Sequence, residues 1–121
     1  MLPMTDLNST INDYIAGWNE TDPSGRRALV DRAFAPDARY LDPHYTGEGH
    51  DGIDAMIAGV QEQFPGHRFE LVDGPDGHHD RVRFTWHLHG PDGPIAVGTD
   101  FATVADDGRL REVTGFLALP A

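Results

Sequence analysis

The hydrophobic periodicity of the chain changes once, near residue 67, and this change constrains the fold more than any other feature. Before it, apolar residues recur every three or four positions, as on one face of a helix. Three such segments are separated by NETDPS at residues 19–24 and by Pro36. After it, apolar and polar residues alternate, as in half-buried strands. We therefore predict three helices followed by an antiparallel sheet, an α+β fold.

Each predicted helix has one apolar face. These faces comprise Leu7, Ile11, Tyr14, Ile15 and Trp18 in the first helix, Leu29, Val30, Ala33 and Phe34 in the second, and Ile53, Met56, Ile57, Val60 and Phe64 in the third. We expect an extended segment at residues 38–43 and a glycine-rich loop at 44–52. Strands are predicted at 67–72, 81–89, 94–104 and 109–119, with turns at 73–80, 90–93 and 105–108.

The chain has 121 residues, a net charge of −11 and no cysteine. This length is typical of a single domain, which we expect to span residues 1–121. The acidic balance argues against nucleic acid as a partner, because phosphate binding needs clustered basic residues. We find neither an apolar segment long enough to cross a membrane nor a signal peptide, so we expect no membrane partner and a cytoplasmic location. The absence of cysteine excludes disulfide bonds and thiolate chemistry.

Asp100 is the most unusual residue of the predicted strands, because carboxylates are rare inside strands. Its own face carries Ala96, Gly98, Ala102 and Val104, and the opposite face carries Ile95, Val97, Thr99, Phe101 and Thr103. Either the larger residues face the core and Asp100 faces solvent, or the small residues line a cavity into which Asp100 points. In a water-poor cavity the pKa of Asp100 would rise, and it could donate a proton near neutral pH.

Four segments, taken in order, resemble the NTF2-like superfamily, in particular its SnoaL-like polyketide cyclases and ketosteroid isomerase-like proteins. They are YIAGWNETD (14–22), LVDRAFAPDARYLDP (29–43), GHDGIDAMI (49–57) and GTDFATVADDGRLREVTGFL (98–117). The resemblance implies an NTF2-like cone, in which about three N-terminal helices pack on a strongly bent antiparallel or mixed sheet and enclose a pocket. It also implies a homodimer formed through the outer face of the sheet.

The resemblance assigns roles to three residues. In ketosteroid isomerases the base lies at the position of Asp42, and a tyrosine and an acid at the positions of Tyr14 and Asp100 hold the enolate oxygen. In the polyketide cyclases the aspartate at the position of Asp100 is the general acid/base. From the residues alone, Tyr14 could equally be a core tyrosine, and Asp42 could be a turn residue before Pro43. Epoxide hydrolase relatives carry an arginine where this chain has Gly98, which argues against their arginine–aspartate chemistry.

Aromatic side chains are expected to form much of the pocket wall. The predicted ligand-binding residues are Trp18, Phe34, His44, Phe64, Phe84, Trp86 and Leu117. Such a wall suits a flat, apolar ligand with a few carbonyl groups. His87 and His89 share a strand face with Arg83 and Thr85, so they should point away from it. We expect no metal and no cofactor, because a metal would need three or four converging ligands.

We therefore predict a small cofactor-free enzyme that performs acid/base proton transfer on a hydrophobic, enolisable carbonyl compound of the polyketide or steroid type. The reaction would be an isomerisation or an aldol-type cyclisation. Asp42 or Asp100 would move the proton, and Tyr14 would stabilise the oxyanion. Two alternatives stay open: a non-catalytic module that binds a hydrophobic small molecule in the same cavity, and an association domain whose cavity is filled by its own side chains.

Overall fold

A computed structural model of the protein describes residues 4–118. The elements are α1 (Met4–Asn19), α2 (Pro23–Ala33), β1 (Phe34–Leu41), β2 (Thr46–Glu48), α3 (Gly49–Gln63), β3 (Arg68–His78), β4 (Arg81–Gly90), β5 (Gly93–Val104) and β6 (Leu110–Ala118). The three predicted helices and the change to strands after the third are therefore confirmed. No helix among the described residues is long and apolar enough to span a membrane.

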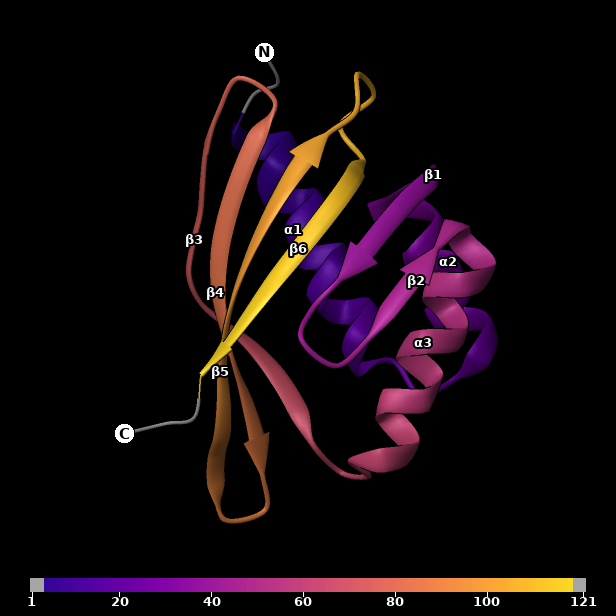
Figure 1. Cartoon of the computed structure of the whole chain (residues 1–121), viewed down its shortest axis with the longest axis vertical. Coiled ribbons are helices and arrows are strands. Elements are labelled where there is room, and N and C mark those ends of the chain that lie inside the picture. Colours follow the sequence, from indigo (N-terminus) through magenta and orange to yellow (C-terminus); the bar gives the residue numbers. More distant parts are fainter. Residues whose placement is uncertain (1–3, 119–121) are drawn as a thin grey trace.

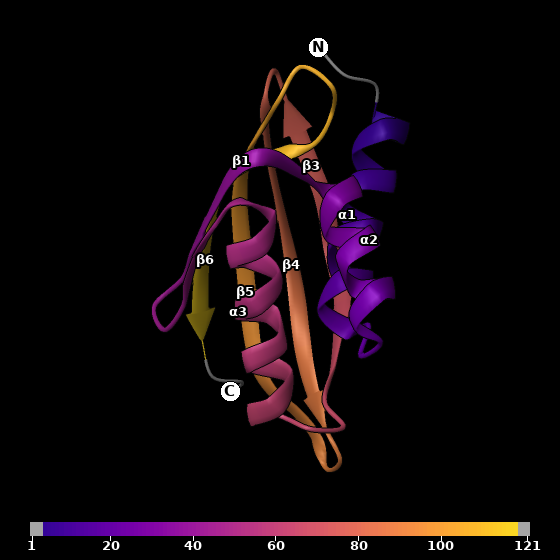
Figure 2. The ribbon, with the colours of Figure 1, turned by 90° about the vertical axis from the view of Figure 1, so that its right-hand side faces the viewer.

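The six strands form one mixed sheet in the order β2-β1-β6-β5-β4-β3. β1 and β6 run parallel, and every other neighbouring pair is antiparallel. The helices pack against this sheet, α1 against β3 and α3 against β1 and β2. The sheet bends so strongly that the helices close one side of an open cone, as the two views of the ribbon show (Figures 1 and 2).

The second helix ends one residue earlier than its apolar pattern suggests. The Asp22 carboxylate caps its start by accepting a hydrogen bond from the backbone N–H of Gly25, at 2.9 Å. Phe34, predicted in the helix, instead has an extended backbone and begins β1. The reason is Pro36, which disfavours helical backbone just before it and cannot donate a helical hydrogen bond.

The segment predicted as a long turn at residues 73–80 is mostly strand. β3 continues through it to His78 and pairs with β4, with irregular register between Leu71 and Asp73 and again between Asp73 and Asp76. Only His79 and Asp80 connect the two strands, and His79 adopts a positive φ of 51°. Bulges of this kind let a strand accept turn-forming residues while the ladder continues.

The exposure of the side chains of β5 shows that Asp100 points to the interior. Asp100 is 1% exposed, whereas Phe101 is 43% exposed on the opposite face. Phe116 on the neighbouring strand β6 is 63% exposed on the same outer face. The larger residues of β5 thus face outward, and the face of small residues lines the interior. A dimer formed through this outer face stays a prediction.

Candidate active site

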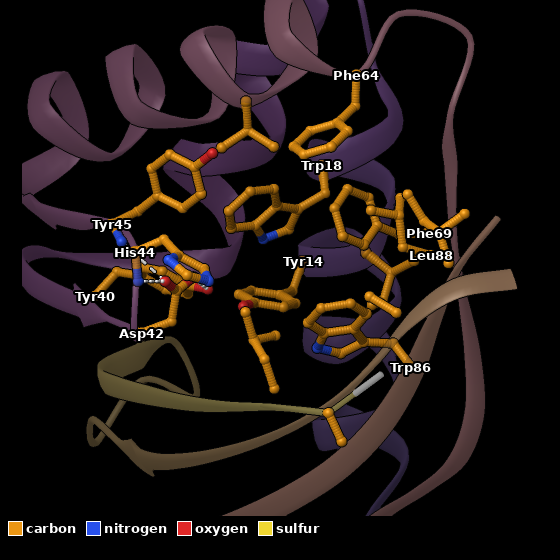
Figure 3. A pocket seen from close by; sticks show the side chains of 16 residues that line it. Tyr14, Trp18, Tyr40, Asp42, His44, Tyr45, Phe64, Phe69, Trp86 and Leu88 are labelled. Atoms are coloured by element: carbon orange, nitrogen blue, oxygen red, sulfur yellow. Dashed lines mark hydrogen bonds between the residues drawn. The ribbon is translucent and has the colours of Figure 1, made fainter. Parts of the chain in front are cut away.

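A pocket of about 510 Å³ lies inside the cone, between the helices and the inner face of the sheet. Its volume suits a small organic ligand. It is lined by Tyr14, Ile15, Trp18, Tyr40, Asp42, His44, Tyr45, Val60, Phe64, Phe69, Trp86, Leu88, Ile95, Ala96, Leu117 and Ala118. Tyr40, Asp42 and His44 gather on one side of it, and Phe69 and Leu88 face them across it (Figure 3). The pocket therefore has a polar end and an apolar end.

Tyr14 and Asp100 form a buried pair at the wall of this pocket. The Tyr14 hydroxyl donates a hydrogen bond to Asp100 Oδ2 at 2.7 Å, joining the middle of α1 to the middle of β5. Tyr14 lines the pocket, and Asp100 lies behind it without lining the pocket itself. Burial raises the pKa of Tyr14 well above its usual value, and the Asp100 charge adds to this effect. Tyr14 therefore stays a hydrogen-bond donor.

Asp100 is held in an environment that disfavours its charge. Burial raises its pKa to about 6, and the negative charge of Asp42 contributes in the same direction. The hydrogen bond from Tyr14 partly offsets the rise. Among the described side chains, Asp100 Oδ1 has no hydrogen-bond partner. Gly115 makes room for this oxygen, because a Cβ there would lie 2.8 Å from Oδ1.

The raised pKa of Asp100 predicts that the protein loses stability as the pH rises from about 4 to 6. In the folded state Asp100 has a pKa of about 6 and keeps its proton up to about that pH. In the unfolded chain its pKa is 3.8, so the proton is released at lower pH. The folded state then binds more protons in this window, so the free energy of unfolding falls with rising pH, by about 3 kcal/mol in total. Urea unfolding of the wild type and Asp100→Asn at pH 4 and pH 7 measures this. A stability difference between the two proteins that does not change with pH would contradict the burial of a titrating Asp100.

Asp42 is both a turn residue and a wall of the pocket. Its Oδ1 accepts hydrogen bonds from the backbone N–H groups of His44 and Tyr45, at 2.8 and 2.9 Å. Its Oδ2 accepts a hydrogen bond from the Tyr40 hydroxyl at 2.6 Å. A turn residue that also lines the pocket is compatible with both interpretations, and the role of base stays a prediction. The first oxygen, Oδ1, orders the loop, and the second, Oδ2, is bonded to Tyr40. Tyr40 holds that second oxygen in place.

Tyr40 is the main site residue that the sequence analysis missed. It lies two positions before Asp42, so on an extended segment both side chains point to the same side. This spacing was the signal that could have identified it. Burial raises the pKa of Tyr40 above its usual value, and the charges of Asp100 and Asp42 reinforce the shift. Tyr45 and Phe69 also line the pocket and were not predicted.

The predicted wall residues divide into two groups. Trp18, His44, Phe64, Trp86 and Leu117 line the pocket, as do Tyr14 and Asp42. Phe34 and Phe84 do not line it. Both are buried in the core, where their rings contact Tyr14 at centroid distances of 5.5 and 5.2 Å. Phe84 shares a strand face with Trp86, but it pairs with Asp100 across the sheet and packs against Tyr14.

Trp86 can reach the pocket because its partner across the sheet is a glycine. Trp86 on β4 lies opposite Gly98 on β5, and a Cβ at Gly98 would be 2.0 Å from Cζ2 of the indole ring. Gly98→Ala is therefore expected to destabilise the protein by about 1–3 kcal/mol through overpacking. Gly59→Ala is the matched control, because its Cβ would meet nothing within 4 Å and glycine is unfavourable inside a helix. Urea unfolding should show a loss for the first and a small gain for the second, and equal effects would contradict the packing described.

Two of the histidines each contact a single acidic residue. His89 Nε2 lies 3.0 Å from Glu70 on the outer side of the sheet. His50 bridges the carbonyl of Phe34, at 2.7 Å, and the carboxylate of Asp31, at 3.1 Å. No group of three or more histidine, aspartate or glutamate residues that could hold a metal is present among residues 4–118.

Comparison with known families decides where this architecture belongs. A family model described as a SnoaL-like domain matches residues 11–113. The chain belongs to the SnoaL-like family. No curated protein matches it significantly.

Solved structures of SnoaL-like proteins share the fold. A provisionally named isomerase of the SnoaL-like family from Agrobacterium tumefaciens strain C58 is 45% identical, with a TM-score of 0.88 over 94% of this chain and 98% of the other. A provisionally named SnoaL-like polyketide cyclase from Jannaschia sp. CCS1 is 21% identical, with a TM-score of 0.75 over 93% and 85%. The second likeness concerns the fold alone. The NTF2-like cone predicted from the sequence is thereby confirmed.

Proposed function

We propose that this SnoaL-like protein catalyses proton transfer on a hydrophobic, enolisable carbonyl compound of the polyketide or steroid type, without a cofactor. One observation carries the proposal: Tyr14, bonded to the buried Asp100 behind it, and Asp42 both line one largely apolar pocket. The names of the structural relatives, isomerase and cyclase, fit this class of reaction.

Asp42 is suited to be the base. Its Oδ2 accepts a single hydrogen bond, from Tyr40, and a carboxylate oxygen has a second lone pair. That lone pair takes the proton from the carbon next to the substrate carbonyl, and the C–H electron pair becomes the C=C bond of an enolate. Asp42 then returns the proton to another carbon, which isomerises the substrate. Alternatively the enolate carbon attacks a second carbonyl, and the alkoxide formed takes up the proton, which closes a ring.

Tyr14 is suited to stabilise the enolate oxygen. With Asp100 ionised, the Tyr14 hydroxyl donates to Asp100 Oδ2. With Asp100 protonated, the carboxylic acid can donate to the Tyr14 oxygen, and the Tyr14 hydroxyl becomes free to donate to the substrate. The pKa of about 6 places this change close to neutral pH. A preorganised donor in a site with little water stabilises developing negative charge strongly.

A purely ligand-binding module would not need this arrangement. Burying the carboxylate of Asp100 costs free energy, and its Oδ1 gains no partner among the described residues. Strained or costly ionisable groups beside a pocket are typical of catalytic sites. The neighbouring Asp42 carboxylate adds to the cost, which favours the enzyme over the binding module.

The test is hydrogen–deuterium exchange at the α-carbons of 2-tetralone in D2O, followed by proton NMR. This probe is a flat, uncharged, enolisable ketone, and its exchange reports proton abstraction whatever the natural product is. We expect an exchange rate that is proportional to protein concentration and saturates with 2-tetralone. Asp76→Asn, at an exposed carboxylate of β3, should match the wild type. A second enolisable ketone of different shape, 4-phenylcyclohexanone, is tested in the same way. If both ketones bind but neither exchanges faster than without protein, the non-catalytic module is supported instead.

A further inference from the structure

We infer that the pocket selects its ligand by the sign of its charge, accepting uncharged and cationic carbonyl compounds and rejecting carboxylates. The inference rests on the proposed function only in taking this pocket as the ligand site. It narrows the class of substrate beyond hydrophobic and enolisable.

No permanently charged cationic side chain of the described residues lines the pocket. Its sixteen lining residues include neither arginine nor lysine, and their one carboxylate is Asp42. Every basic residue of the chain other than histidine is an arginine, and seven of the nine form ion pairs with carboxylates elsewhere. Arg39 and Arg68 have exposed side chains on β1 and β3 and do not line the pocket. An anionic ligand would therefore find no counter-ion there.

The backbone donors at the polar end are already used. The N–H groups of His44 and Tyr45 form a small cradle of the kind that binds anions, and the carboxylate of Asp42 occupies it. The Tyr40 hydroxyl donates to the same carboxylate. The protein thus fills its own anion site with Asp42, and a ligand carboxylate would meet that negative charge in a pocket with mostly apolar walls.

A cationic or uncharged ligand meets the opposite situation. Trp18, Tyr40, Phe69 and Trp86 present aromatic rings around the cavity, with centroid distances of 5.4 Å from Trp18 to Tyr40 and 5.1 Å from Phe69 to Trp86. The Tyr40 side chain lies beside Asp42, to which its hydroxyl donates a hydrogen bond (Figure 3). Aromatic faces attract cations, and the adjacent carboxylate adds to this attraction. An uncharged ligand avoids the repulsion and keeps the apolar contacts.

Three probes with one skeleton test the inference: 4-phenylcyclohexanecarboxamide, 4-phenylcyclohexanecarboxylate and 4-phenylcyclohexylammonium at pH 7.5. The amide and the carboxylate have nearly the same shape and differ in charge. Both tryptophans of the chain line the pocket, so their fluorescence reports binding directly. We expect the carboxylate to bind at least about tenfold more weakly than the carboxamide, which is about 1.4 kcal/mol. The ammonium should bind at least as tightly as the carboxamide.

Three variants identify the source of the discrimination. Asp42→Asn should reduce the ratio of the carboxamide affinity to the carboxylate affinity by at least about threefold, because it removes the negative charge that repels the ligand. Asp76→Asn removes a carboxylate charge from the outer side of the sheet and should leave the ratio of the two affinities unchanged. His44→Gln removes the one histidine that lines the pocket, and the ratio of the carboxamide and carboxylate affinities should stay the same or increase.

The outcomes separate this inference from the proposed function. A carboxylate that binds within threefold of the carboxamide overturns the inference, even where 2-tetralone exchange occurs. An ammonium as weak as the carboxylate also overturns it, because an apolar pocket would then reject any ion regardless of sign. Failure of all three probes to bind overturns it as well. The expected order of affinities without any 2-tetralone exchange leaves charge selection standing and removes the catalytic proposal.

Discussion

Tyr14→Phe is expected to slow protein-catalysed exchange of 2-tetralone by about 10²–10³-fold, with little change in 2-tetralone affinity. The substitution removes the hydroxyl of this lining residue and keeps the aromatic ring packed against Phe34 and Phe84. Loss of one preorganised oxyanion donor has an effect of this size, because the donor matters more in the transition state than in the bound ketone. Exchange by proton NMR and affinity by tryptophan fluorescence measure the two quantities separately.

Tyr45→Phe is the matched control for this substitution. Tyr45 also lines the pocket, but its hydroxyl bonds to Gln63 and not to Asp100. We expect its exchange rate to stay within about threefold of the wild type. Thermal unfolding checks that Tyr14→Phe is still folded, since it leaves Asp100 Oδ2 without its donor. Equal losses in the two variants would show that the pocket tolerates no change of shape, and would contradict a specific role for the Tyr14 hydroxyl.

Asp42→Asn is expected to reduce the exchange rate by about 10²–10⁴-fold, the range typical of a lost general base. An amide oxygen can still accept the hydrogen bonds from His44 and Tyr45, so the loop should keep its conformation. The amide cannot take up a proton at neutral pH, which is why the loss should fall on the exchange rate rather than on affinity. The same NMR and fluorescence measurements apply.

A surface carboxylate provides the comparison for Asp42. Asp76→Asn makes the same chemical change outside the pocket and should leave the rate unaltered. If Asp42→Asn keeps most of the activity while Asp100→Asn loses it, the proton is moved by Asp100, and our assignment of the base is wrong. That result would still be acid/base catalysis in this pocket, with the roles of the two carboxylates exchanged.

The apolar pattern was sufficient to predict the helices and most strands, because it follows the buried faces directly, whereas the cone was implied by the family resemblance. In β4, Val82, Phe84, Trp86 and Leu88 alternate with polar residues, and all four are buried. The pattern of β5 was ambiguous, since its larger residues lie on the face opposite Asp100. The inward face of β5 has Gly98 where the Trp86 ring of β4 needs space. This contact joins two strands, so the pattern of one strand cannot show it.

The site was predicted less completely than the fold, and the gaps have a common cause. Periodicity identifies a buried face but not how far along the strand the cavity ends. Phe84 and Trp86 therefore had the same prediction, although one is core and the other is pocket wall. Tyr40 was overlooked although it lies two positions before Asp42 in the segment predicted to be extended, because the pattern does not show that the two side chains form a hydrogen bond. The family resemblance brought Tyr14 and Asp100 together, which periodicity alone could not do.

The pH dependence of the exchange rate, measured for the wild type and for Asp100→Asn between pH 5 and 9, tests the central claim most directly. The claim is that Asp100, which has a pKa of about 6, must be protonated before the Tyr14 hydroxyl can donate a hydrogen bond to the substrate oxygen. The wild-type kcat/KM should then fall about tenfold per pH unit above that pKa. Asp100→Asn keeps an uncharged donor at this position and should show no such decline. A wild-type profile that stays flat from pH 6 to 9 would contradict the claim.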